Sequence, residues 1–327
     1  MAAAMIPPDH APAFLAAHGW GGAEILPLAG DASFRRYFRI VGNGRRAVLM
    51  DAPPESEDSR PFLALSDYLR GHGFRAPELL AVDLDKGLIL LEDFGDVLMR
   101  GAIEDRPAHE ERIYAQAVDI LASLHRVPPA ATPPYDWAAY ERELLLFTQW
   151  YLPAIGRPAD EASYLAAWRE AMAPLLAERA DAVTVLRDYH AENLMLLANG
   201  DMGLLDFQDA LAGHRAYDLV SLLQDARRDV APALEATMID RYCSVADIAD
   251  RAAFEAAYAL LGAQRNAKIV GIFTRLWQRD GKHRYLSLIP RVWALLERDL
   301  AHPALAPVAR WMDDHLPVGE RTVPHAG

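Results

Sequence analysis

The spacing of hydrophobic and polar positions changes near residue 95. Before this point, short apolar runs at 37–40, 47–50 and 87–91 have the length and alternation of β-strands. A longer stretch at 60–72 has helical spacing and ends at a pair of glycines, which commonly close a helix. The first part of the chain therefore predicts a small sheet with one helix packed on it.

The spacing then becomes mostly helical. Apolar residues recur every three or four positions within 113–124 and again within 140–151, with a proline-rich loop between them. Three short β-like runs interrupt the helical part, at 183–186, 194–197 and 203–207. Helical spacing resumes at Leu219. The pattern predicts an α+β protein with a β-rich N-lobe at 1–95 and an α-rich C-lobe at 96–327.

Composition and charge restrict the class of protein. The formal net charge of −13 repels phosphate backbones, so nucleic acid is not expected as a partner. The single cysteine, Cys243, cannot form an internal disulfide, which fits a reducing compartment. The first residues lack the pattern of a secretory signal, and no apolar run approaches the ~20 residues that span a bilayer. We expect a cytoplasmic protein without a membrane anchor; the oligomeric state stays open.

The residues with the clearest chemistry lie in the β-like insert. It reads LRDYHAENLMLL and then LLDFQDA, so Asp188 and Asn193 are five apart and Asp206 follows thirteen residues later. Phosphoryl transfer to a hydroxyl needs a carboxylate that orients or deprotonates that hydroxyl, and oxygen ligands that hold Mg²⁺ on the ATP phosphates. Asp188 suits the first task, and Asn193 with Asp206 suits the second. A lone D-x4-N pair often arises by chance in a turn, but a strand–turn–strand followed by D-F is the protein-kinase arrangement.

The chain resembles the aminoglycoside phosphotransferase family. The resemblance rests on GDASFRRYFRI at 30–40, VLMDAPP at 48–54, LLEDFGD at 90–96, LRDYHAENLM at 186–195, LLDFQDALAGHRAYDLVSLLQDARRDV at 204–230 and AQRNAKIVGIFTRLWQRDGKHRYL at 263–286. It implies a two-lobed protein-kinase-like fold that binds ATP and Mg²⁺. Within the family, it implies phosphorylation of the anomeric hydroxyl of N-acetylmuramate and N-acetylglucosamine to the 1-phosphate, for cell-wall recycling to UDP-sugars.

The nucleotide side departs from the usual kinase pattern. The loop that covers the phosphates is expected at Gly30, Asp31, Ala32 and Ser33. Met50 falls near the position of the usual strand lysine, and the following helix has no glutamate to pair with one. Another cation should then meet the phosphates; of Arg35 and Arg36, we favour Arg36, with a solvated strand-edge arginine as the alternative. A hinge is expected at the end of the third strand, where Glu92 and Phe94 would offer main-chain groups to adenine.

The acceptor side is predicted from a local change of charge. Residues 264–284 hold six lysines and arginines against one acid, and Arg265 and Lys268 share an otherwise apolar helical stripe. Such residues face either a cleft or a buried partner, and they favour a neutral or anionic sugar over a polycation. The other expected substrate residues are Arg187, His190, Glu192, Gln208 and Asp209. Asp218 is expected to cap the next helix and to support the catalytic loop.

Three alternatives stay open. The first is the same enzyme class with another acceptor, such as an aminoglycoside, choline or homoserine. The second is a non-catalytic nucleotide-binding pseudokinase, which the missing strand lysine suggests and the intact Asp188, Asn193 and Asp206 oppose. The third is a sugar kinase that acts on a hydroxyl other than the anomeric one.

Overall fold

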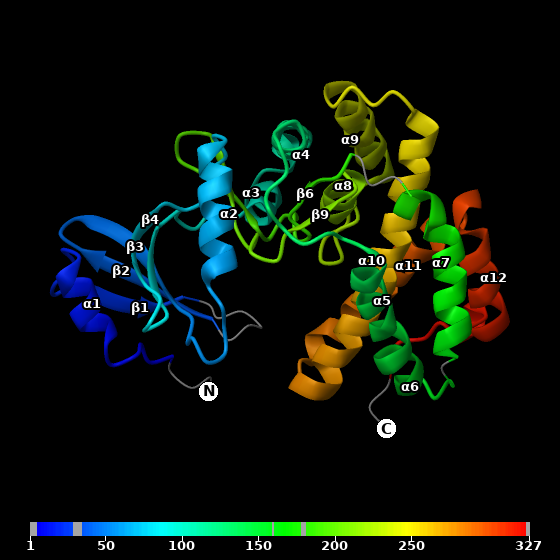
Figure 1. Ribbon diagram of the computed structural model, residues 1–327, viewed down its shortest axis with the longest axis horizontal. Coiled ribbons are helices and arrows are strands. Elements are labelled where there is room, and N and C mark those ends of the chain that lie inside the picture. Colours follow the sequence, from blue (N-terminus) through cyan, green and yellow to red (C-terminus); the bar gives the residue numbers. More distant parts are fainter. Residues whose placement is uncertain (1–4, 29–34, 159, 178–180, 325–327) are drawn as a thin grey trace. The chain divides into compact units, whose positions relative to one another are not determined.

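The computed structural model (Figure 1) describes residues 5–28, 35–158, 160–177 and 181–324. The chain packs as two compact units: Met1–Asp105 with Glu192–Asp209, and Arg106–Ala191 with Ala210–Gly327. The sequence predicts that each lobe is one continuous stretch of chain, 1–95 and 96–327. The observed division differs, because a short helix and a later hairpin pack with the first unit.

The first unit is built on a five-stranded antiparallel sheet. Its strands lie in the order β1, β2, β3, β5, β4 and span Glu24–Pro27, Arg36–Gly42, Arg45–Asp51, Leu88–Glu92 and Leu79–Asp83. The three predicted strands are confirmed as β2, β3 and β5. The edge strands β1 and β4 were not predicted, because most of their residues are at least partly exposed and show no buried face.

Alternation along the strands gives this sheet two different faces. The core face packs against α1, Ala11–Ala17, through Phe38, Ile40, Ala47, Leu49, Leu88 and Leu90. On the opposite face, Arg39, Val48 and Leu91 are cross-strand neighbours and line a cavity. A register slip by one residue would exchange the two sets, so the apolar core fixes which side chains reach the cavity.

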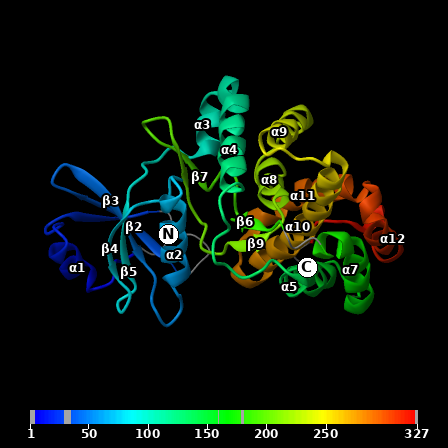
Figure 2. The same ribbon diagram turned by 45° about the horizontal axis from the view of Figure 1, so that its top comes forward.

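Two further helices belong to the first unit. The predicted helix is confirmed as α2, Arg60–Gly71, which lies beside the sheet in both views (Figure 1 and Figure 2). Its Phe62 stacks on Phe207 with ring centroids 5.2 Å apart. The second helix, α3, spans Met99–Asp105 and lies just past the predicted end of the N-lobe.

A hairpin of β7, Leu194–Leu196, and β8, Met202–Leu204, completes the first unit. A side chain at Gly203 would place its Cβ 2.5 Å from the Phe94 ring, so the close approach requires glycine. The apolar pattern predicts a longer second strand than is found. The strand stops before Asp206 because that residue has a φ of 58°, which is incompatible with extended structure.

The second unit is mainly helical. Its helices are α4 (Glu110–Leu124), α5 (Trp137–Leu146), α6 (Leu152–Ala154), α7 (Glu161–Ala177), α8 (Ala216–Leu223), α9 (Pro232–Val245), α10 (Arg251–Asp280), α11 (Ile289–Leu300) and α12 (Ala306–His315). A two-stranded sheet pairs β6, Val183–Val185, with β9, Leu211–Gly213. The helical segments predicted at 113–124 and 140–151 are confirmed, the latter as α5 followed by a π-helical turn.

The long helix α10 is the centre of the second unit and contacts α5, α8 and α11. A Cβ at Gly271 would lie 2.3 Å from the carbonyl carbon of Leu146, so glycine lets α10 cross the end of α5 at close range. The middle of α10 is buried on all sides, including its polar side chains. Such side chains need partners within the fold or in a ligand. None of the helices in the described ranges is both long and apolar enough to cross a membrane.

Candidate active site

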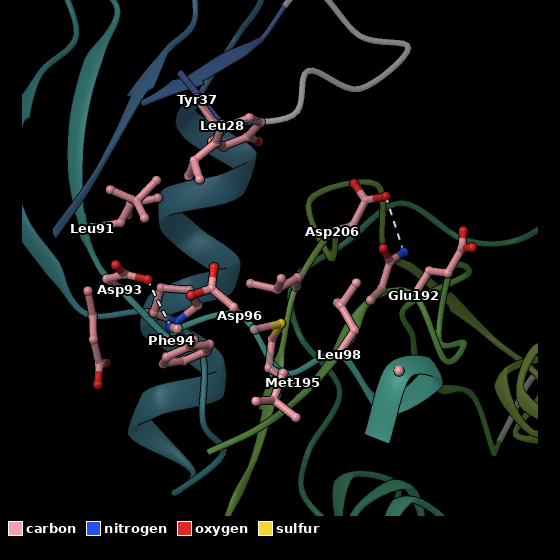
Figure 3. A pocket seen from close by; sticks show the side chains of 18 of the residues that line it. Leu28, Tyr37, Leu91, Asp93, Phe94, Asp96, Leu98, Glu192, Met195 and Asp206 are labelled. Carbon is pink, nitrogen blue, oxygen red and sulfur yellow. Dashed lines mark hydrogen bonds between the residues drawn. The ribbon is translucent and has the colours of Figure 1, made fainter. Parts of the chain in front are cut away.

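The first unit contains a cavity of about 810 Å³ (Figure 3). Its walls come from the exposed face of the sheet, from the segment after β5 and from the hairpin. Figure 3 shows Tyr37, Leu91 and Phe94 on one side of this space, with Met195 and Asp206 opposite them. A cavity of this volume with apolar walls and a few polar groups is typical of a small-molecule site.

Two of the residues predicted for the nucleotide side, Glu92 and Phe94, line this cavity. The Glu92 carboxylate accepts a hydrogen bond from Arg75 at 2.8 Å, so its side chain is engaged by the protein itself. The Arg75 guanidinium lies 5.5 Å from the centre of the Phe94 ring. The predicted phosphate-covering residues, Gly30, Asp31, Ala32 and Ser33, lie outside the described residues.

Arg36 occupies the face of β2 that points away from the cavity. Its Nε donates to Asp51 Oδ2 at 2.7 Å, and its Nη1 donates to the Ile6 carbonyl at 3.0 Å. It is not among the described residues that line the cavity. The other candidate, Arg35, pairs with Glu57 at 2.5 Å. The structure therefore gives both arginines protein partners and gives Arg36 no place on the cavity wall.

The arginine of β2 that lines the cavity is Arg39. Its Nε lies 2.8 Å from Asp93 and its Nη1 lies 2.7 Å from Asp96, both on the segment after β5. These two ion pairs of Arg39 hold the segment after β5 against the sheet beside the cavity. Sequence reasoning missed Arg39, although strand alternation puts it on the same face as Tyr37 and on the opposite face from Arg36.

The two predicted magnesium ligands lie together at the cavity wall. Asn193 Nδ2 donates to Asp206 Oδ2 at 3.3 Å, drawn as a dashed line in Figure 3, and Gln208 Nε2 donates to Asp206 Oδ1 at 2.7 Å. The left-handed φ of Asp206 is a strained conformation of a kind concentrated at functional sites. One carboxylate and one amide oxygen are hard donors that fit Mg²⁺.

This pair is an incomplete ligand set for a metal ion. The described ranges hold no group of three or more His, Cys, Asp or Glu side chains in a metal-binding arrangement. Mg²⁺ is commonly held by one or two protein carboxylates, with phosphate and water oxygens completing its shell. The residues present therefore fit an ion that arrives with a phosphate ligand.

The predicted acceptor residues divide between the two units. Glu192 and Gln208 line the cavity of the first unit, where Glu192 pairs with Arg100 at 2.6 Å. Asp209 is exposed and is not one of the described lining residues. The remaining four, all in the second unit, are Arg187, His190, Arg265 and Lys268.

The loop that carries Asp188 is held in place by Asp218. The Asp218 carboxylate accepts the backbone N–H groups of Leu186 and Arg187 at 2.6 and 2.8 Å, so the predicted support of the loop is confirmed. The predicted helix cap is wrong, because both carboxylate oxygens serve the loop instead. Burial raises the pKa of Asp218 to about 7 in spite of these two donors.

Asp188 lies among positive charges in the second unit. Desolvation by itself would raise the pKa of its carboxyl, but Lys268, His190 and Arg265 outweigh this and hold the pKa below its usual value. Asp188 is therefore ionised at neutral pH. An ionised carboxylate can orient a hydroxyl and accept its proton.

Glu143 of α5 balances the charge of this cluster. It accepts hydrogen bonds from Tyr135 at 2.5 Å, Arg187 at 2.5 Å and Gln264 at 2.9 Å, and Lys268 Nζ lies 3.4 Å away. Burial opposes its ionisation, yet the charges of Lys268 and Arg187 keep the pKa of Glu143 below its usual value. No motif marks Glu143; its role follows only from the packing of α5 against α10.

His190 and Arg265 complete the cluster. His190 is buried, and burial lowers the pKa of its imidazole. Arg227 Nη1 lies 3.4 Å from His190 Nε2. Arg265 is buried on α10 and lowers the pKa of both Asp188 and Asp218, so it lies within electrostatic reach of the loop.

The chain matches a known family over most of its length. The sequence profile of the phosphotransferase enzyme family matches residues 24–257. The chain is 38% identical to the N-acetylmuramate/N-acetylglucosamine kinase of Caulobacter vibrioides, over 94% of this chain and 96% of that one. It is 40% identical to the protein of the same name from Pseudomonas aeruginosa, over 90% of both chains.

Solved structures agree at the level of the fold. A putative aminoglycoside phosphotransferase from Ralstonia eutropha matches with a TM-score of 0.66 at 18% identity, over 92% of this chain and 98% of that one. The choline kinase LicA from Streptococcus pneumoniae matches with a TM-score of 0.60 at 13% identity, over 84% and 93%. These matches confirm the predicted α+β fold of the aminoglycoside phosphotransferase and choline kinase type.

Proposed function

The chain belongs to the phosphotransferase enzyme family, and we propose that it is an ATP-dependent kinase for the anomeric hydroxyl of N-acetylmuramate and N-acetylglucosamine. The observation that carries the proposal is the close similarity to two bacterial kinases of that name over at least 90% of each chain. The complete set of Asp188, Asn193 and Asp206 supports turnover rather than mere nucleotide binding. The sugar 1-phosphate formed would feed cell-wall recycling.

In this proposal the cavity of the first unit receives ATP. Backbone groups at Glu92 and Phe94 meet the adenine edge, and Tyr37 and Leu91 cover one of its faces. Gly30, Asp31, Ala32 and Ser33 cover the phosphates. Asn193 and Asp206 hold Mg²⁺, which neutralises phosphate charge when bound. Gln208 supports this site because its hydrogen bond fixes the orientation of the Asp206 carboxylate.

The proposed chemistry at the acceptor rests on Asp188. The anomeric hydroxyl gives its proton to the ionised Asp188 carboxylate as its oxygen forms a bond to the γ-phosphorus. The bond from that phosphorus to the β,γ-bridging oxygen breaks, and ADP leaves. Because the anomeric hydroxyl is more acidic than an ordinary alcohol, Asp188 contributes mainly by orienting it. Lys268, Arg265 and their neighbours disfavour a polycationic acceptor such as an aminoglycoside.

The test is a direct search for the product. The purified protein is incubated with ATP, Mg²⁺ and, in parallel, N-acetylmuramate, N-acetylglucosamine, choline or kanamycin, and ³¹P and ¹H NMR identify the product. We expect a sugar 1-phosphate, and we expect Asp188→Asn to lower its rate of formation roughly 10²- to 10⁴-fold. A phosphorylated choline or kanamycin, a phosphate on another sugar hydroxyl, or no product at all would contradict the proposal.

A further inference from the structure

The basic side chains that act on Asp188 include Lys268, Arg265 and Arg187, and these three differ in their partners. Arg187 donates to Glu143 at 2.5 Å. Lys268 donates to the Tyr217 hydroxyl at 2.7 Å and lies 3.4 Å from the same glutamate. Arg265 is only 3% exposed, and its Nε and Nη1 have no hydrogen-bond partner in the part of the chain that the structure describes.

A buried guanidinium without an acceptor is costly. It brings five N–H donors and a full positive charge out of water. The carboxyls of Asp188 and Asp218 are near enough to feel that charge, but no group in the described ranges accepts a hydrogen bond from its Nε or Nη1. Glu143 is already shared by Arg187 and Lys268, and the oxygens of Asp218 accept backbone N–H groups. Arg265 is thus a cation of this cluster whose Nε and Nη1 still have hydrogen bonds to donate to an incoming anion.

We propose that Arg265 binds the carboxylate of an acidic amino sugar and so sets the preference for N-acetylmuramate over N-acetylglucosamine. The inference rests on the proposed function and adds the side chain that distinguishes one acceptor sugar from the other. The two sugars share the anomeric hydroxyl, but only N-acetylmuramate carries a lactyl carboxylate. A planar guanidinium matches a carboxylate with two parallel hydrogen bonds, which a lysine cannot supply.

The decisive experiment compares acceptors in the wild-type enzyme and in Arg265→Met. Steady-state kcat/KM is measured with N-acetylmuramate, its neutral methyl ester and N-acetylglucosamine. In the variant, we expect kcat/KM for the acid to fall roughly 10- to 100-fold, with a much smaller change for the ester and for N-acetylglucosamine. Equal losses with all three acceptors would overturn the inference, because Arg265 would then act on the shared chemistry at Asp188 or on the transferred phosphate.

The matched control is Arg279→Met, which makes the same change on the same helix at an exposed position paired with Asp280. It should leave all three kcat/KM values unchanged. Thermal unfolding of both variants is measured alongside, because a loss of folded protein would lower kcat/KM equally for all three acceptors, whereas the proposal expects the loss for the acid.

The comparison of acid and ester in the wild-type enzyme needs no variant. If the enzyme phosphorylates both, and kcat/KM is higher for the acid by about tenfold or more, the enzyme recognises the carboxylate, as proposed. If it treats them alike, this inference fails while the proposed function stands. If neither N-acetylmuramate nor N-acetylglucosamine is phosphorylated, the proposed function itself fails.

Discussion

The cavity of the first unit and the charged cluster of the second both contain ion pairs between a basic side chain and a glutamate, but these pairs differ in their exposure to solvent. In the cavity, the pair of Arg100 and Glu192 keeps 38% and 31% of its side chains exposed. In the cluster, Glu143 and Lys268 keep 10% and 9%. Ion pairs in contact with water contribute little to stability because solvent screens them, whereas breaking a buried pair leaves a charge that water cannot reach. Equal substitutions in the two regions should therefore have very different effects.

The two regions also position their residues by different means. Strand register selects the side chains of the sheet that reach the cavity, so the apolar core on the far face decides them. In the cluster, hydrogen bonds to Glu143 and Asp218 hold the residues in position. We expect changes around the cavity to alter nucleotide affinity, and changes around the cluster to alter stability and the chemistry of Asp188 together.

The largest expected effect on stability is that of Glu143→Gln. The substitution keeps the shape of the side chain but removes the negative charge that Arg187 and Lys268 share, so the charge of both cations is offset less in a buried site. We expect the free energy of unfolding to fall by about 3–5 kcal/mol, measured by urea denaturation at pH 7.

Glu170→Gln is the matched control in the same unit. Glu170 is exposed and lies 3.8 Å from the exposed Arg310, so its loss should change the free energy of unfolding by less than about 0.5 kcal/mol. A loss below about 1 kcal/mol for Glu143→Gln would mean that the cluster is as well solvated as a surface pair, and the contrast between the two regions would disappear.

Asp218→Asn sharpens the comparison through pH. Because burial raises the pKa of Asp218 to about 7, the folded state holds its proton more tightly than the unfolded state does. Its contribution to stability is therefore full below the unfolded value of about 4 and is lost as the pH rises through about 7. We expect the difference in free energy of unfolding between wild type and variant to shrink from pH 4 to pH 8. A difference that grows with pH would show instead that hydrogen bonds to the carboxylate dominate over burial.

Much of the fold follows from local patterns in the sequence. Strand β2 alternates buried and partly exposed residues, β3 and β5 contain short continuous buried runs, and α4 has an apolar stripe, so local apolar patterns predict all four. The edge strands were missed because hydrogen bonds to their neighbours create them, without a buried face of their own. The inclusion of the hairpin in the first unit depends on long-range packing of Gly203 against Phe94, which no local pattern encodes.

The candidate site residues that lie on one continuous motif could be predicted from the sequence. A loop and a hairpin fix the spacing of Asp188, Asn193 and Asp206, so this spacing is visible in the sequence itself. Arg39 escaped prediction, and so did the charge-balancing role of Glu143, because partners that are distant in sequence define these roles. Which arginine of β2 faces the cavity depends on the register of that strand, which is set by the core rather than by the arginines themselves.

Arg36→Ala should have the smallest of the three effects on stability. It tests an ion pair whose burial is intermediate between those of the two regions. Asp51 is only 2% exposed, but Arg36 keeps 41% of its side chain in solvent. Truncation leaves a buried carboxylate without its arginine, so we expect a loss of about 1–2 kcal/mol in the free energy of unfolding. The KM for ATP should be unchanged, because Arg36 occupies the face of β2 opposite the cavity.

The control for this substitution is Arg46→Ala, an exposed position on the neighbouring strand β3, which should alter neither quantity. If Arg36→Ala raises the KM for ATP at least tenfold while stability stays constant, then Arg36 leaves Asp51 to meet the nucleotide, and the ion pair is a resting state of a binding residue. If stability falls and the KM is constant, the pair belongs to the sheet. The cation that compensates for Met50 must then be sought among other residues.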